Sequence, residues 1–293
     1  MIVAVASGKG GTGKTTVAAS LTSIWDGPVV AVDLDVEEPN LHLFLHPAIA
    51  GSEMAHMTVP QVEEAKCTYC GACSELCQFK ALAVFNQMIL TFPEMCHGCG
   101  GCMAICPEKA ISPGQRELGE ISWGQAGGAG FLAGRLRIGE AMSPPLMRRV
   151  KARLDQMLAA TGGDAIIDAP PGVSCPAVNA VMDSDVILLV TEPTPFGFYD
   201  FRLAWEAFTP LGKPLGAVIN RAGLGNDAIY RFCREKGLPI LAEIPYDRAI
   251  AEAYSCGRII ADLSPGLQET FVMLRDQIRG LAKPSRSREA AHA

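Results

Sequence analysis

A glycine-rich loop near the N-terminus constrains the possible folds of this chain more than any other stretch. The loop occupies residues 7–16 (SGKGGTGKTT), after an apolar run at 2–6 and before a segment at 16–25 that suits a helix. Strand, glycine loop and helix, in this order, form the context in which G-x-x-x-x-G-K-[ST] binds phosphate. The backbone N–H groups of such a loop turn onto one anion, and the helix N-terminus adds positive charge. The sequence therefore predicts a P-loop nucleotide site on a parallel α/β sheet.

Two side chains of the loop have the chemistry that a bound nucleotide requires. The Lys14 ammonium can reach the β- and γ-phosphates, and the Thr15 hydroxyl is placed to ligate Mg²⁺. We therefore expect ATP and Mg²⁺ as ligands of the loop. The expected phosphate-binding residues are Gly8, Gly10, Gly11, Thr12, Gly13, Lys14, Thr15 and Thr16.

Carboxylates follow or end two apolar segments that are typical of buried parallel strands. Asp35 follows the segment at 29–34, and Asp168 ends the segment at 164–168. Both side chains are expected in the ligand crevice, because the carboxyl ends of parallel strands face it. Asp168 is a candidate Walker B residue that holds Mg²⁺ through water, and Gly172 would present its N–H to the γ-phosphate. Surface charge at a strand end is the alternative for Asp35.

An additional lysine, Lys9, directly follows the first glycine of the loop. The resulting G-K-G-G-T-G-K-T resembles the deviant Walker A loop of the MinD/ParA/Mrp and nitrogenase iron protein superfamily. D-A-P-P-G at 168–172 resembles switch II of the Mrp branch. The resemblance implies an ATP-dependent homodimer in which Lys9 reaches the nucleotide of the partner chain. The expected catalytic residues are then Lys9, Lys14, Asp35 and Asp168.

The same resemblance extends to switch I and to the adenine ring. It implies that Asp35 lies in switch I, where it positions the attacking water or the magnesium shell. It also implies that Asn220 and Arg221 recognise adenine, and that Pro245 and Tyr246 pack beside the ring. Plain turns are the alternative at both places.

Eight of the eleven cysteines form an internal repeat with the spacing C-x2-C-x2-C-x3-C, displaced by 29 positions. This is the spacing of bacterial two-cluster ferredoxins, in which three close cysteines hold one [4Fe–4S] cluster and the fourth crosses to the other. Zinc sites prefer isolated C-x2-C pairs. We assign Cys67, Cys70, Cys73 and Cys106 to one [4Fe–4S] cluster, and Cys96, Cys99, Cys102 and Cys77 to the second.

Cys175 is a separate case. Its spacing from Asp168 resembles that of a cysteine in the nitrogenase iron protein, which holds a cluster shared between subunits. The second cysteine of that family has no match in this chain. We therefore interpret Cys175 as a buried structural thiol.

The repeat divides the chain. A hairpin is expected between the cysteine runs, with strands at 82–85 and 88–92. A glycine-rich segment at 119–137 is predicted to be a flexible hairpin loop between strands, and a helix is predicted from Ser143 to about Ala160. The fold class is α/β: a P-loop NTPase, with a mostly parallel sheet and helices on both faces, interrupted by a small α+β bacterial-type ferredoxin domain. The predicted divisions are ATPase at 1–59, ferredoxin at 60–115, ATPase at 116–282 and a disordered tail at 283–293.

Composition narrows the possible partners. The net charge of −6 argues against a general nucleic-acid-binding surface. No apolar run approaches the ~18 residues of a membrane span, and the last helix lacks the membrane-targeting character of MinD, so we expect no membrane anchor. The N-terminal apolar run leads straight into the loop and is not read as a signal peptide. Cysteines at metal-ligand spacing favour a cytoplasmic location.

Three functions compete at this stage. The first is an ATPase that uses its nucleotide-driven dimer to control electron transfer through the clusters to a redox or metal-cofactor assembly protein. The second is an Mrp-like carrier or scaffold for iron–sulfur clusters. The third is a positioning ATPase, as MinD and ParA are. We favour the first, because eight cysteines that fully ligate two clusters suit electron storage or relay better than cluster delivery.

Overall fold

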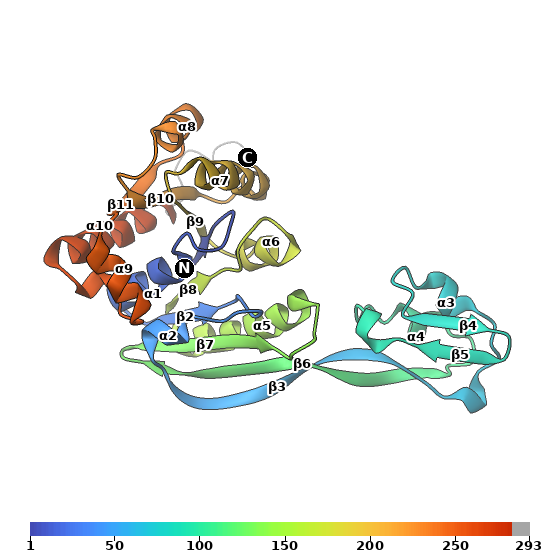
Figure 1. Ribbon diagram of the computed structural model, residues 1–293. Coiled ribbons are helices and arrows are strands. Elements are labelled where there is room, and N and C mark those ends of the chain that lie inside the picture. The colour runs from blue at the N-terminus through green and yellow to red at the C-terminus, as the bar shows by residue number, and fades with distance from the viewer. Residues whose placement is uncertain (283–293) are drawn as a thin grey trace, which may run out of the picture. The chain divides into compact units, whose positions relative to one another are not determined.

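The computed structural model describes residues 1–282, and the predicted tail at 283–293 lies outside the described residues. The chain divides into two compact units, shown in Figure 1. Of the described residues, unit 1 contains 1–53, 121–135 and 147–282. Unit 2 contains residues 54–120 and 136–146.

A sheet of nine strands in the order β11-β10-β9-β1-β8-β2-β7-β6-β3 organises the fold. All neighbours from β11 to β7 run parallel. β7 follows β6 after a two-residue turn, the connection of an antiparallel pair. The strands are β1 Ile2–Ala6, β2 Val29–Asp33, β3 Ala48–Val62, β6 Ile111–Ala126, β7 Ala129–Leu136, β8 Asp164–Asp168, β9 Val186–Thr191, β10 Leu215–Ala222 and β11 Ile240–Pro245.

Helices cover both faces of the parallel part of this sheet. Val3 and Val5 of β1 face a core that includes side chains of α1 and α10. Ala4 points to the opposite face because strand side chains alternate, and it is also fully buried. The α/β P-loop prediction is therefore confirmed. The helices of unit 1 are α1 Lys14–Ser23, α2 His42–Leu45, α5 Ser143–Thr161, α6 Cys175–Val181, α7 Pro195–Phe208, α8 Ala228–Lys236, α9 Arg248–Ser255 and α10 Pro265–Ala282.

The glycine-rich segment at 119–137 corrects one prediction. The expected hairpin is present, but the segment is not a flexible loop, because β6 and β7 occupy it almost entirely and residues 127 and 128 form the turn between them. Gly124 serves close packing instead: a Cβ there would lie 2.1 Å from the carbonyl oxygen of Ala48. The prediction treats glycine as a chain breaker, whereas Gly124 allows β6 and β3 to approach each other closely.

Unit 2 repeats its backbone as it repeats its sequence. Short helices at α3 Ala72–Leu76 and α4 Gly101–Ile105 stand 29 positions apart, and so do two 3₁₀ turns at Glu64–Lys66 and Pro93–Met95. Lys80 and Lys109, again 29 apart, both have positive φ. The predicted hairpin is confirmed as β4 Leu82–Phe85 and β5 Met88–Thr91, paired antiparallel.

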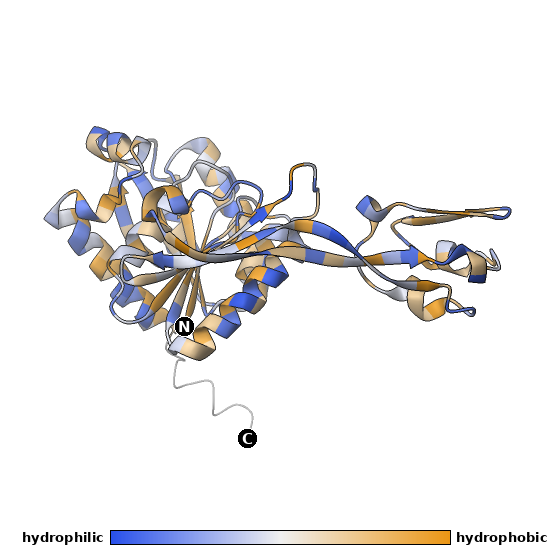
Figure 2. Cartoon of the chain, turned by 90° about the horizontal axis from the view of Figure 1, so that it is seen from below, coloured by the Kyte–Doolittle hydropathy of each residue, from blue (hydrophilic) through white to orange (hydrophobic). Residues whose placement is uncertain are grey.

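Hydrophilic and hydrophobic residues alternate along the helices, as Figure 2 shows. Within residues 1–282, none of the helices is both long and apolar enough to cross a membrane.

Candidate nucleotide site and cysteine repeat

The glycine loop joins β1 to α1 with its anion-binding groups available. Gly11 and Gly13 have φ of 78° and 97°, which side-chain-bearing residues rarely adopt. Gly13 is the N-cap of α1, and no side chain caps the helix. The first N–H groups of α1 are therefore left for a ligand, in the geometry that favours phosphate.

One pocket in unit 1, with a volume of about 340 Å³, brings the loop together with distant segments. Predicted residues in its lining are Gly10, Gly11, Gly13, Lys14, Thr15, Thr16, Asp35, Asn220, Arg221, Pro245 and Tyr246. The pocket also contains residues that sequence reasoning missed, among them Glu38, Asn40, Pro171, Ile250 and Tyr254. Gly8, Lys9, Thr12, Asp168 and Gly172 do not line it.

Three carboxylates meet Lys14 behind the loop. Asp33 and Asp168 are direct neighbours on β2 and β8, and both are almost completely buried. Burial raises the pKa of Asp168 to about 6 against the attraction of Lys14, and burial likewise raises the pKa of Asp35 to about 6. Burial also lowers the pKa of Lys14, although Asp168, Asp35 and Asp33 oppose the change. The site thus concentrates negative charge that it does not fully neutralise.

These residues fit a magnesium ion. The Oδ1 atom of Asp168 is buried and has no hydrogen-bond partner among the described residues. The Thr15 hydroxyl hydrogen-bonds the same carboxylate, so the predicted magnesium ligand and the Walker B candidate are adjacent. A cation bound beside them would satisfy the unpaired oxygen and offset the carboxylate charge.

Asp33 is a further carboxylate of the site, beside Asp35 and Asp168, and it was given no role from the sequence. The side chain is fully buried and accepts hydrogen bonds from the backbone N–H groups of Leu41 and Asp35. Burial and the neighbouring Asp168 raise its pKa well above the usual range. Asp33 therefore anchors the loop that presents Asp35, and its position at the end of β2 was the available signal.

Two predicted ligand contacts are engaged within the chain. The Asn220 side-chain amide donates a hydrogen bond to the Thr12 carbonyl at 2.8 Å, which ties β10 to the loop. The Gly172 N–H donates to the Ser7 carbonyl at 2.9 Å instead of standing free for a γ-phosphate. Cys175 corrects a further prediction, because it is exposed and not buried.

Lys9 stands apart from the pocket lining and forms an ion pair in its own chain. Its Nζ lies 2.7 Å from Oε1 of Glu192, and Nη1 of Arg221 lies 2.6 Å from Oε2 of the same carboxylate. Glu192 directly follows β9, so the strand-end argument that identified Asp35 also applies to it.

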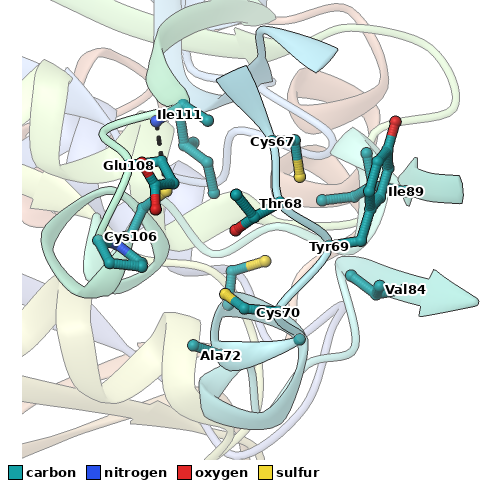
Figure 3. A pocket seen from close by; sticks show the side chains of 14 residues that line it. Cys67, Thr68, Tyr69, Cys70, Ala72, Val84, Ile89, Cys106, Glu108 and Ile111 are labelled. Carbon is teal, nitrogen blue, oxygen red and sulfur yellow. Dashed lines mark hydrogen bonds between the residues drawn. The ribbon is translucent and has the colours of Figure 1, made fainter. Parts of the chain in front are cut away.

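The repeated cysteines are free thiols in unit 2. Those assigned to the first cluster, Cys67, Cys70, Cys73 and Cys106, line one pocket, shown in Figure 3. Burial raises the pKa of the Cys73 thiol, and the nearby thiols of Cys67 and Cys106 raise it further. The fourth cysteine of the second run therefore lies beside the first run.

The second set follows the same pattern, with one buried, two half-buried and one exposed cysteine in each set. Burial raises the pKa of Cys102, with further contributions from Cys96 and Cys99. Cys77 and Cys102 pack on the same small apolar core. Within residues 1–282, no three His, Cys, Asp or Glu side chains are grouped as ligands of a single metal ion.

Known relatives cover almost the whole chain. Two uncharacterized proteins of Methanocaldococcus jannaschii, MJ0578 and MJ0579, are each 31% identical to it. The first match covers 95% of this chain and 96% of the relative, and the second covers 88% and 90%.

Solved structures share the fold. The cell division ATPase MinD of Pyrococcus furiosus matches with a TM-score of 0.58 and 24% identity, over 96% of this chain and 98% of MinD. MinD of Pyrococcus horikoshii, solved with Mg-ADP, matches with a TM-score of 0.58 and 20% identity, over 97% and 99%. A ParA family ATPase of Chlorobium tepidum matches with a TM-score of 0.56 and 16% identity, over 94% and 96%.

The family follows from the sequence match together with this fold. The CobQ/CobB/MinD/ParA nucleotide binding domain matches residues 3–260, a range that contains the glycine loop, the three carboxylates and the pocket. The chain belongs to the CobQ/CobB/MinD/ParA family of nucleotide-binding domains.

Proposed function

We propose that the chain binds and hydrolyses ATP with Mg²⁺ and acts as a nucleotide-dependent homodimer. The observation that carries this proposal is the pocket in which the glycine loop, Asp35 and the 245–247 segment meet. Lys14 and the N-terminus of α1 hold the phosphates, Thr15 and Asp168 hold Mg²⁺, and Asp35 orients the attacking water. Lys9 then stabilises the negative charge that develops in the transition state at the γ-phosphate of the partner chain's nucleotide.

Nucleotide titration tests the site directly. A fluorescent ATP analogue should bind the wild-type protein in a Mg²⁺-dependent manner, and Lys14→Ala should weaken binding strongly. Lys9→Ala should retain binding but lose at least about tenfold in hydrolysis, because it removes only transition-state stabilisation. Hydrolysis by Lys9→Ala at the wild-type rate would contradict the cross-dimer role.

For unit 2 we propose two [4Fe–4S] clusters. The supporting observation is that Cys67, Cys70, Cys73 and Cys106, which come from both runs, share one pocket. A cubane takes its four thiolates on four different irons, so its ligands stand further apart than those of one ion. Backbone N–H groups of Ala81 and Ala110 donate to the sulfurs of Cys77 and Cys106, each at 3.3 Å. Such hydrogen bonds lower the charge density on cluster thiolates.

The clusters would supply one-electron transfer, and the chain's own contribution is to enclose and orient them. Anaerobic purification should yield about eight irons per chain with the absorbance of [4Fe–4S] clusters. About two zinc ions per chain, without that absorbance, would contradict the assignment.

Two cellular roles follow, and the comparisons favour the second. In the first, the ATPase governs electron transfer to a redox or metal-cofactor assembly protein. In the second, it is a positioning ATPase, because the neighbours of similar fold are cell-division and ParA-family ATPases. Anaerobic affinity purification in ATP and in ADP distinguishes the roles: a co-purifying redox or cofactor-assembly protein supports the first, and a cargo or cell-division protein supports the second.

A further inference from the structure

Glu192 forms ion pairs with two basic side chains near the proposed nucleotide site. Its Oε1 lies 2.7 Å from Nζ of Lys9, and its Oε2 lies 2.6 Å from Nη1 of Arg221. Arg221 lines the nucleotide pocket, whereas Lys9 does not. The glutamate thus connects the lysine expected to act on a partner chain with the wall of its own nucleotide site.

The carboxylate is fixed in place independently of Lys9. The Thr194 hydroxyl hydrogen-bonds Oε1 at 3.2 Å and also caps α7 by accepting from the Gly197 N–H at 3.0 Å. A Cβ on Gly197 would lie 2.7 Å from Cγ of Glu192, so the helix packs directly against this side chain. Only 9% of the Glu192 side chain is exposed, compared with 29% of Lys9. Lys9 is therefore the movable member of the pair.

We propose that Glu192 retains Lys9 within its own chain and thereby opposes dimerisation until a partner's nucleotide competes for the lysine. Glu192 is a positioning residue in this scheme, since it acts through Lys9. The inference rests on the proposed function, because it requires that Lys9 serves the nucleotide of a second chain.

Arg221 makes the release of Lys9 reversible. A nearly buried carboxylate that loses its only cationic partner is strongly destabilised. Glu192 keeps Arg221 and the Thr194 hydroxyl when Lys9 leaves, so no unpaired buried charge results. The ion pair can therefore hold the lysine without trapping it.

The experiment compares dimerisation of wild type, Glu192→Gln and Glu192→Asp by sedimentation velocity across a titration of ATPγS with Mg²⁺. Glu192→Gln keeps the shape but removes the charge, and Glu192→Asp retracts the carboxylate from Lys9 while keeping a charge near Arg221. Glu206→Gln is the matched control, because Glu206 lies in α7 as an exposed partner of Arg202 and carries the same charge. We expect Glu192→Gln to dimerise about fivefold more tightly or better, within the usual range of coupling between sites, with a smaller gain for Glu192→Asp.

The gain must depend on Lys9. Lys9→Ala combined with Glu192→Gln should dimerise no better than Lys9→Ala alone, a dependence that a purely structural role of Glu192 would not produce. If folded Glu192→Gln dimerises no more tightly than wild type, this inference alone is overturned. If neither protein dimerises although ATPγS binds, the cross-dimer role of Lys9 fails and this inference fails with it. Should Glu192→Gln not fold, Glu192→Asp decides by the same criteria.

Discussion

Replacing Asp168 by asparagine should stabilise the nucleotide-free protein at alkaline pH while removing its response to Mg²⁺. The pKa of Asp168 is about 6 in the fold against an ordinary value of 3.8. A raised pKa means that folding favours the protonated acid, so its contribution to stability is complete below about pH 4 and is lost as pH rises through about 6. Two pKa units correspond to about 3 kcal/mol. Asparagine cannot ionise and avoids this loss.

Lys14 reduces the expected gain. Asp168 raises the pKa of this buried lysine, and removing the carboxylate leaves the ammonium less compensated. We therefore expect Asp168→Asn to gain on the order of 1–2 kcal/mol at pH 8 and close to nothing at about pH 4.5.

Urea unfolding followed by tryptophan fluorescence measures this difference in the relevant part of the chain, because Trp25, Trp123 and Trp205 all belong to unit 1. Asp155→Asn, an exposed carboxylate on α5, serves as the control. Addition of Mg²⁺ and ATPγS should stabilise only the wild type, which should then have a higher free energy of unfolding than Asp168→Asn. The reasoning is refuted if Asp168→Asn is less stable than wild type at pH 8, or if its advantage is the same at both pH values.

Three further outcomes can be checked with simpler measurements. Gly8→Ala should lower the free energy of unfolding by about 1–3 kcal/mol, because the new Cβ would lie 1.9 Å from the Asp200 carbonyl oxygen; an unchanged melting temperature would refute this. Lys14→Ala should abolish stabilisation by ATPγS in a thermal melt, and full retention of it would exclude Lys14 from the phosphate site. Cys73→Ser should reduce iron from about eight to about four per chain while Cys233→Ser leaves it unchanged, and equal iron in both would contradict the cluster assignment.

The parallel part of the fold could be predicted because its signals are local. Its strands other than β7 contain short apolar runs, and β2 is buried at every position, so burial on both faces leaves a continuous hydrophobic pattern. β7 lies in the glycine-rich segment that was predicted to be a loop. β3 was missed for the opposite reason. Most of its fifteen residues are exposed or half-buried, and no apolar run marks it as a strand; apolar and polar residues alternate only over 55–59.

The phosphate loop was predictable from its motif, whereas its partners in the fold were not. Tyr254 lies in α9, far from the loop in sequence, and meets it only in the folded pocket. Burial also decides what a carboxylate does, and nothing in V-D-L-D indicates that Asp33 is fully buried while Asp35 faces the pocket. Intramolecular partners such as Thr12 for Asn220 are likewise invisible in a sequence.

Electron transfer and positioning make different demands on unit 2, and those demands separate them better than fold similarity does. A P-loop sheet serves either role, since function depends on the site that a fold carries. A positioning ATPase gains nothing from eight cysteines at cubane spacing, whereas an electron carrier needs every one of them. The four thiols of the first set meet in one pocket although Cys106 comes from the other run, a convergence that unrelated structural cysteines have no reason to produce. The iron content of the anaerobic protein therefore bears on its function more directly than any further comparison of its ATPase fold.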